Sequence, residues 1–231
     1  MKKHLIIIAI VMLSSGVFAQ NLKYKINSMG FKVADLSLII GKDQLYVKAS
    51  NDGIRTLFPH LNNTYKVSFD QDYLPKTYTR IIHQDALKDS VTTIYSQGAA
   101  TMYRKSDNNE VIYRIPAKSH DIFTLLTRIS QIPKAVGEYY VDGNGRAWKA
   151  IVSGGKSENL KTSLGIFQTT KYELRFKAQS PHKAPYVDML THNFLDESLH
   201  LSIWVNQGGI PVKAHLKKRL MVMTWEIQSI S

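Results

Sequence analysis

The sequence predicts a mainly β protein whose single antiparallel sheet is strongly curved, as a roll or half-barrel, with one helix packed against it. Polar and apolar residues alternate with a period of two through most of the chain, which is typical of strands with one buried face. Clusters of Gly, Asn and Asp separate these segments, as they do in tight hairpins. Only one segment has the 3.6-residue period of an amphipathic helix. A sheet of roughly a dozen strands needs curvature or closure to protect its edges.

The first residues have the order of a secretory signal peptide. Lys2 and Lys3 form a positive end, and residues 5–13 are apolar. This apolar run is shorter than the roughly 20 residues that a helix needs to cross a bilayer. We therefore expect an exported protein, periplasmic or secreted, that is not an integral membrane protein.

The predicted cleavage site lies between Ala19 and Gln20. Val17 and Ala19 supply the small residues that signal peptidase requires at positions −3 and −1. We expect residues 1–19 to be removed as a signal peptide and, where present, to extend from the protein as a helix with few contacts. Residues 20–231 are expected to form one β-rich domain, since a chain of this length can bury its own core.

The strand prediction is strongest where the two sets of residues alternate without interruption, at residues 65–70, 171–178, 199–206 and 221–227. Residues that tolerate positive φ lie between the predicted strands, at residues 51–53, 107–109, 142–145 and 207–209. Such short connections favour antiparallel hairpins.

Two hairpin segments resemble each other in sequence. They are residues 69–76 (FDQDYLPK) and residues 205–213 (VNQGGIPVK). The likeness indicates either a faint internal repeat or two hairpins that use the same turn.

One helix is predicted at residues 119–131. Ser119 is a suitable N-cap, and Asp121 follows in the first turn, where the helix dipole favours an acidic residue. Apolar residues recur at helical spacing, namely Ile122, Leu125, Leu126 and Ile129. We expect this apolar side to pack on the sheet.

The composition limits the partners. The chain has 30 Lys and Arg against 18 Asp and Glu and no Cys, so it forms no disulfide and has no cysteine nucleophile. Removal of residues 1–19 lowers the net charge from +12 to +10. Outside the cytoplasm the candidate anionic partners are lipid, lipopolysaccharide or acidic polysaccharide, and nucleic acid is not expected. The alternative is that the positive charge is a solvated surface.

The sequence contains none of the motifs that identify common catalytic sites. A Gly-rich phosphate loop, a GxSxG nucleophile and an HExxH zinc helix are all absent. His192 and His200 flank Asp196 and Glu197, which indicates either a mixed metal site or, as we favour, loop and strand-edge residues. We therefore predict no catalytic residues, no metal and no cofactor.

The candidate ligand-binding residues are aromatic and polar. Tyr78, Arg80 and Trp204 lie on strand faces interpreted as exposed, where a ring can stack on a sugar or an acyl chain. Tyr186 and His192 belong to residues 179–198, a long connection without clear periodicity. A connection of this kind either closes one end of the sheet or gates a cleft.

The order of several motifs resembles a bacterial family of exported proteins known only as domain of unknown function 3108. The matching segments span nearly all of the chain after the signal peptide, at residues 24–38, 74–80, 121–128, 165–169 and 201–213. The resemblance implies a periplasmic or exported, single β-rich domain. It supplies no catalytic residues.

These observations favour a non-enzymatic binding or envelope-maintenance protein. A helix across a curved sheet makes an apolar groove that suits an amphiphile, and we expect a cavity between the sheet and Ile122, Leu126 and Ile129. The alternative is a polysaccharide-active enzyme or its accessory subunit. Convergent carboxylates, or a carboxylate beside a His, would favour the enzyme, whereas a smooth apolar groove would favour the carrier.

Overall fold

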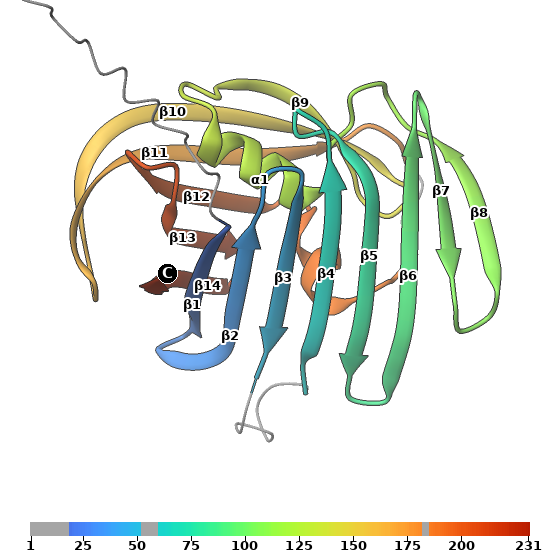
Figure 1. The fold of residues 1–231 in the computed structure, drawn as a ribbon, viewed down its shortest axis with the longest axis horizontal. Coiled ribbons are helices and arrows are strands. Elements are labelled where there is room, and N and C mark those ends of the chain that lie inside the picture. Colours follow the sequence, from blue (N-terminus) through green and yellow to red (C-terminus); the bar gives the residue numbers. More distant parts are fainter. Residues whose placement is uncertain (1–18, 52–59, 182–184) are drawn as a thin grey trace, which may run out of the picture.

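Figure 1 shows the computed structural model, which describes residues 19–51, 60–181 and 185–231. The predicted signal peptide up to residue 18 lies outside the described residues, and so does most of the turn predicted at residues 51–53. The elements, in chain order, are β1 (Gln20–Ser28), β2 (Phe31–Ile40), β3 (Gln44–Ser50), β4 (Asn62–Phe69), β5 (Pro75–Gln84), β6 (Leu87–Ser96), β7 (Ala99–Arg104), β8 (Asn109–Arg114), α1 (Ile122–Gln131), β9 (Gly137–Asp142), β10 (Ala147–Thr162), β11 (Gly165–Ala178), α2 (Met189–Phe194), β12 (Leu199–Asn206), β13 (Pro211–Lys218) and β14 (Met221–Ile230).

The described strands form one antiparallel sheet in the order β8-β7-β6-β5-β4-β3-β2-β1-β14-β13-β12-β11-β10-β9. Strands that are consecutive in sequence pair with each other, except β8 and β9, and β1 pairs with β14 to join the two halves of the chain. The sheet is strongly curved but not closed, since β8 and β9 are its edges (Figure 1). The predicted fold class, a curved antiparallel sheet with a packed helix, is confirmed.

The inner face of the curve carries the core. In β12, Leu199, Leu201, Ile203 and Val205 are buried, whereas the residues between them are half-buried or exposed. The same alternation in β1 to β4 and β11 to β13 builds one main apolar cluster. Burial of apolar area at roughly 25 cal/mol per Å² is the dominant stabilising contribution to such a core.

Helix α1 lies inside the curve of the sheet (Figure 1). Its N-cap is Asp121, not the predicted Ser119. The Asp121 carboxylate accepts hydrogen bonds from the backbone N–H groups of Phe123 (2.8 Å) and Thr124 (3.2 Å), while the Ser119 hydroxyl donates to the Pro116 carbonyl (2.6 Å). The helix therefore begins two residues later than the pattern suggests, because a carboxylate satisfies two orphan N–H groups at once.

The two similar hairpin segments form the same turn. Asp70 begins the turn between β4 and β5, and Asn206 begins the turn between β12 and β13. The side chain of Asp70 accepts a hydrogen bond from Leu74 N–H (2.8 Å), and that of Asn206 accepts one from Ile210 N–H (2.9 Å). Both turns also place their fourth residue, Tyr73 or Gly209, at positive φ (59° and 74°).

These two turns bind α1 from both halves of the sheet. The Arg128 guanidinium donates to the Asp72 carbonyl (3.0 Å), and the Gln131 side-chain amide donates to the Gly209 carbonyl (3.0 Å). His120, just before the helix, contacts the Tyr73 carbonyl through Nδ1 (2.9 Å). The turns thus fix the position of α1 over the cavity described below.

The short helix α2 lies within residues 179–198, the long connection in which the sequence shows no clear periodicity. Asp188 caps this helix and is fully buried. Its carboxylate accepts hydrogen bonds from Thr191 N–H (2.8 Å) and from the Tyr65 hydroxyl of β4 (2.9 Å). Phe194 is also buried, with its ring 5.2 Å from that of Trp225. Helix α2 therefore packs onto the inner face of the sheet.

Candidate functional site

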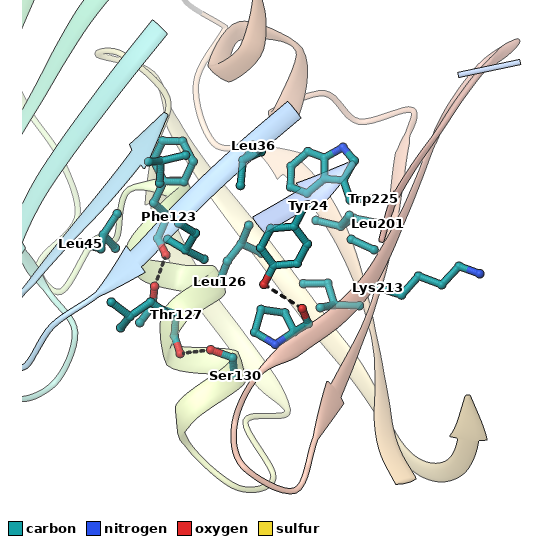
Figure 2. Close-up of a pocket in the computed structure, with 16 residues that line it drawn as sticks. Tyr24, Leu36, Leu45, Phe123, Leu126, Thr127, Ser130, Leu201, Lys213 and Trp225 are labelled. Atoms are coloured by element: carbon teal, nitrogen blue, oxygen red, sulfur yellow. Dashed lines mark hydrogen bonds between the residues drawn. The ribbon is translucent and has the colours of Figure 1, made fainter. Parts of the chain in front are cut away.

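An apolar cavity lies between α1 and the sheet, at the junction of the two halves (Figure 2). About 70 Å³ is available in it to the centres of water-sized spheres. Its lining comes from six strands and the helix, and consists of Tyr24, Leu36, Leu38, Ile40, Leu45, Val47, Phe123, Leu126, Thr127, Ser130, Leu201, Ile203, Pro211, Lys213, Ala214 and Trp225. The cavity confirms the expectation of an apolar space between the helix and the sheet.

The helix face that lines the cavity is displaced from the predicted one. Leu126 lines it as expected, but Ile122 and Ile129 are buried elsewhere. The lining residues of α1 are Phe123, Leu126, Thr127 and Ser130, which have the i, i+3, i+4, i+7 spacing of one face. Hydropathy selects the neighbouring face, because Thr127 and Ser130 count as polar in the sequence.

Hydrogen bonds within the helix make those two residues apolar toward the cavity. The Thr127 hydroxyl donates to the Phe123 carbonyl (2.9 Å), and the Ser130 hydroxyl donates to the Thr127 carbonyl (2.8 Å), as Figure 2 shows. Ser and Thr often bond in this way to the preceding turn of their own helix. Both donors are therefore satisfied without a ligand.

Tyr24 crosses the cavity from β1 toward β13. Its hydroxyl donates to the Pro211 carbonyl (2.8 Å), and burial raises the pKa of this phenol above its ordinary value. Tyr24 thus presents a neutral ring to the cavity. Lys213 lies at the rim, with its ammonium group directed away from the apolar side chains (Figure 2).

Tyr78 and Arg80 are not on an exposed face, so the interpretation of their strand face as exposed is wrong. Only 3% of Tyr78 and 1% of Arg80 are exposed. In β5 the inward positions are Tyr78, Arg80 and Ile82, so the set of alternate residues that contains the charged Arg80 faces the interior. The pattern misleads because an Arg on the inner face looks like an outward residue when only hydropathy is considered.

Arg80 is the centre of a buried polar cluster between β5 and the turn after β9. Its guanidinium donates to Asn144 Oδ1 and to the Thr93 hydroxyl (2.8 Å), and it lies 4.6 Å from the centre of the Tyr78 ring. Burial lowers the pKa of Arg80, but Tyr78, Tyr95 and Asp188 together raise it above its ordinary value. The charge is therefore retained in the interior.

Two buried acids that interact with each other, Asp142 and Asp121, lie in the same region of the interior. Asp142 accepts hydrogen bonds from the hydroxyls of Tyr113 (2.8 Å) and Tyr95 (3.1 Å), and burial raises its pKa. Burial also raises the pKa of Asp121 to about 6. The sequence gives little signal for this cluster, because Asp142 belongs to a Gly-rich turn that predicts solvent exposure.

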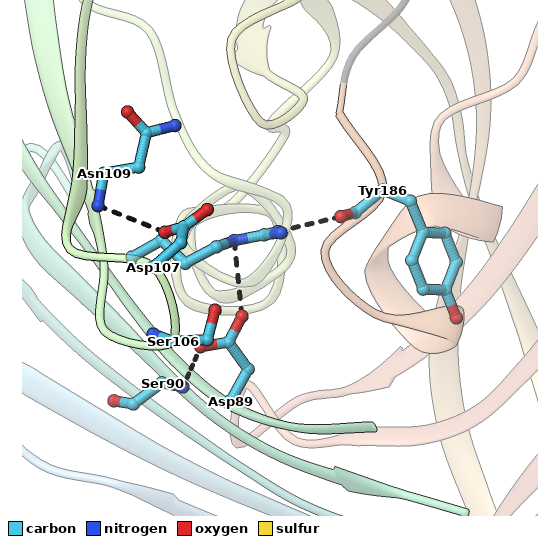
Figure 3. Close-up of polar contacts among 7 residues, drawn as sticks. Asp89, Ser90, Ser106, Asp107, Asn109 and Tyr186 are labelled. Atoms are coloured by element: carbon cyan, nitrogen blue, oxygen red, sulfur yellow. Dashed lines mark hydrogen bonds and ion pairs between the residues drawn. The ribbon is translucent and has the colours of Figure 1, made fainter. Parts of the chain in front are cut away.

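Tyr186 and His192, the two candidate residues of the long connection, lie near each other, with ring centres 5.3 Å apart. Tyr186 is half exposed, and its carbonyl accepts a hydrogen bond from the Arg104 side chain of β7 (2.9 Å). Arg104 also forms an ion pair with Asp89 of β6 (3.3 Å). Its side chain therefore connects β6 and β7 to Tyr186, which precedes α2 (Figure 3).

A second, polar pocket of about 560 Å³, by the same measure, lies beside α2. It holds His192, Asp196 and Glu197, together with Lys218 and the ring of Trp148. Both acids have structural partners: Asp196 pairs with Lys218 (3.1 Å), and Glu197 accepts a hydrogen bond from Ala178 N–H (3.1 Å). Despite partial burial, hydrogen bonds from Ser198 and the charge of Lys218 lower the pKa of Asp196 to about 2.

Trp204 lies apart from these pockets, half-buried on the outer side of β12. Its indole N–H donates to the Glu158 carboxylate, and the Lys171 ammonium lies 5.2 Å from its ring centre. His200 on the same strand contacts Arg175. Within the described ranges, no group of three or more His, Cys, Asp or Glu residues is arranged to hold a metal ion.

No helix in the described part of the chain is long and apolar enough to span a membrane. No family model matches the chain, and no curated protein sequence matches it. The resemblance to domain of unknown function 3108 therefore rests on the sequence motifs alone.

Solved structures match the fold. A β-barrel-like protein of domain of unknown function DUF1849 from Brucella abortus is similar over 92% of this chain and 97% of that chain, with a TM-score of 0.60 and 7% identity. A protein with a YmcC-like fold from Bacteroides fragilis NCTC 9343 covers 92% of this chain and 95% of its own, at 8% identity, with a TM-score of 0.33. At 7% identity the first likeness shows the fold alone, and this fold is shared with a bacterial β-barrel-like protein of a domain of unknown function.

Proposed function

We propose that this is an exported, non-enzymatic protein that binds an amphiphile in the periplasm or outside the cell, after removal of residues 1–19. The observation that carries the proposal is the chemistry of the cavity beneath α1. Its walls are apolar side chains, and the two helix hydroxyls in them are satisfied by the helix itself. A surface of this kind favours a hydrocarbon chain over a sugar, because it offers a sugar few hydrogen-bond partners.

The rim of the cavity favours an anionic head group. Lys213 is one of the lining residues, and its side chain points away from the apolar walls. None of the ion pairs in the described residues uses this ammonium group. A fatty acid or an acidic lipid could place its chain in the cavity and its head group beside Lys213, which agrees with the positive charge of the whole chain.

The size of the cavity implies that α1 moves when a ligand enters. Pockets for drug-sized ligands have volumes of about 300–1,000 Å³, and the 70 Å³ measured here holds only part of one chain. The contacts of α1 with the two turns, through Arg128 and Gln131, are the bonds that such a movement would break. Each is a single hydrogen bond to a carbonyl, which contributes about 1 kcal/mol.

Titration with a fluorescent fatty acid tests the proposal. Ala214 lines the cavity from β13, and Ala214→Phe should fill the space and weaken binding at least about tenfold, which corresponds to about 1.4 kcal/mol. Ala86→Phe, in the exposed turn between β5 and β6, is the matched control and should bind as the unaltered protein does. Circular dichroism must show that both variants are folded.

Lys213→Ala provides a second arm that leaves the cavity open. It should weaken binding of a fatty acid but not of the fatty alcohol of equal length. The proposal fails if the unaltered protein binds neither probe, or if folded Ala214→Phe binds both as well as the Ala86→Phe control. Native mass spectrometry of protein isolated from its host gives an independent measurement, because a co-purifying amphiphile should be present.

The alternative, a polysaccharide-active enzyme or its accessory subunit, would use the polar pocket beside α2. Its support is that His192, Asp196 and Glu197 share that pocket. The engagement of both carboxylates with structural partners favours the carrier instead. Release of reducing ends from an envelope polysaccharide, lost in Glu197→Gln, would favour the enzyme.

A further inference from the structure

Strand β8 is an exposed edge of the sheet (Figure 1). Its sequence is Asn-Glu-Val-Ile-Tyr-Arg, and among the described strands it pairs only with β7. Ile112 is 71% exposed, an unusual position for a large aliphatic residue on a strand. Glu110 and Arg114 are exposed on the same face of the strand, and neither forms an ion pair within the described residues.

The backbone of β8 also directs hydrogen-bond donors and acceptors to the open edge of the sheet at Glu110, Ile112 and Arg114. Ile115 N–H donates to the Gly98 carbonyl of the β7 side (3.2 Å). Hydrogen-bonded pairs alternate along an antiparallel ladder, so residues 113 and 111 also direct their backbone groups toward β7. Glu110, Ile112 and Arg114 therefore direct their N–H and C=O groups outward.

We propose that β8 pairs with β8 of a second copy of this chain, antiparallel and centred on Ile112. In this register Ile112 lies opposite Ile112 of the partner subunit. Glu110 then lies opposite Arg114 of the partner subunit, and the second such pair follows from the two-fold symmetry. Two copies of the strand thus complement each other, because the isoleucines form an apolar contact and the charged residues form opposite pairs. About six backbone hydrogen bonds form between the two strands.

The neighbouring strands extend this complementary surface. Ile94 of β6, Thr101 of β7 and Ile112 form one row across the outer face, because Thr101 is the register partner of both isoleucines. Ile94 is 55% exposed. In the dimer the row continues into the same row of the second copy, which covers exposed apolar area on both chains.

The other edge of the sheet is less suited to pairing. Residue His120 forms a bridge to β9, with its N–H donating to the Tyr140 carbonyl (2.8 Å) and its carbonyl accepting from Asp142 N–H (2.7 Å). Part of the β9 edge is therefore already occupied. Since β8 has only six residues, the interface is small and the dimer should be weak and concentration-dependent.

Sedimentation equilibrium of the purified protein, from micromolar to millimolar concentration, tests the proposal. The unaltered chain should shift from monomer to dimer as concentration rises. In a dimer of either variant, Glu110→Arg or Arg114→Glu, residues 110 and 114 carry like charges in both symmetry-related pairs. Each substitution should therefore weaken association at least about tenfold. An equimolar mixture of these two variants should associate as the unaltered protein does, because both opposing pairs are then of opposite charge.

Lys76→Glu is the matched control for Arg114→Glu, because it makes the same change in net charge at an exposed position of β5. It should leave association unchanged. The proposal is overturned if the unaltered protein stays monomeric over the whole range, if its dimer is insensitive to both reversals, or if the mixture of variants does not associate. Circular dichroism of each variant establishes that a loss of association is not a loss of folding.

Discussion

Arg80 shows at the scale of one residue how this fold tolerates charge in its interior. The guanidinium is buried, and its bonds go to neutral oxygens of Asn144 and Thr93 rather than to a carboxylate. The buried acids Asp142 and Asp188 balance its charge from nearby. Removing one member of a buried charged group usually costs more than the whole group contributes, because the remaining charges are left uncompensated.

We predict that Arg80→Met lowers the free energy of unfolding by about 3–5 kcal/mol. The Met side chain fills much of the space but leaves the acids without a cation and Asn144 without its donor. Equilibrium unfolding in urea measures the change. Lys76→Met, an exposed position on the same strand, is the control and should change stability by no more than about 0.5 kcal/mol. Equal effects of the two substitutions would contradict the role assigned to Arg80.

His120 and Asp121 have opposite effects on how stability depends on pH. Burial lowers the pKa of His120 to about 4, so the folded state favours its neutral form; the stability contributed is complete above pH 6.5 and is lost as the pH falls toward 4. Burial raises the pKa of Asp121 to about 6, so the folded state holds the proton more tightly. Its contribution is greatest below pH 3.8 and is lost as the pH rises through 6.

Substitution should separate these two contributions. Asp121→Asn keeps a good N-cap and removes the titration, so its stability relative to the unaltered protein should increase from pH 4 to pH 7, by about 1–3 kcal/mol. His120→Gln should change in the opposite direction and gain relative stability from pH 7 to pH 4. Urea unfolding at several pH values gives both slopes. Slopes of the same sign in the two variants would show that the assignment is incorrect.

At the scale of elements, α1 depends on tertiary contacts more than on its length. A ten-residue helix is marginal by itself in water, so its position is fixed by packing and by its bonds to the two turns. The equivalent turns after β4 and β12 bind it from opposite halves of the sheet through Arg128 and Gln131. The helix therefore bridges the two halves directly above the cavity.

We predict that Arg128→Ala combined with Gln131→Ala loosens α1 without unfolding the sheet. Hydrogen exchange of the amides in residues 122–131 should accelerate about 10–30-fold, as expected for the loss of two hydrogen bonds of about 1 kcal/mol each. Peptides from β12 should be unaffected. Ser130→Ala is the control, since its hydroxyl bonds only within the helix. Uniform acceleration in every peptide would indicate global destabilisation and contradict a local role.

For the whole molecule, the sequence predicts the sheet well wherever one face is apolar. Residues 199–206 alternate strictly, and β12 has those bounds because every second side chain enters the core. The prediction fails where polar residues face inward. In β5 the inward set includes Tyr78 and Arg80. The hydrogen-bond partners of Arg80, Thr93 and Asn144, are 13 and 64 residues away in sequence.

The sequence predicts an apolar cavity beneath the helix, but it does not predict which helix face lines the cavity. A helix laid across a curved sheet implies an apolar cavity, and Leu126 is correctly placed in its wall. The exact helix face depends on whether Thr127 and Ser130 bond to their own helix, which hydropathy cannot show. The polar cluster around Arg80 depends on the fold bringing β5, the turn after β9 and α2 together, so no local pattern predicts it.

The position of the N-terminus gives the last prediction. Strand β1 begins at Gln20, directly after the predicted cleavage site, and Asn21 exchanges backbone hydrogen bonds with Ser231 (2.8 and 3.0 Å). Cleavage after Ala19 would leave every one of these bonds intact, whereas removal of several more residues would delete Asn21 and the fully buried Leu22. N-terminal peptide mapping of the exported protein should therefore find Gln20, in part as pyroglutamate. An intact Met1, or a mature end several residues beyond Gln20, would contradict the predicted processing.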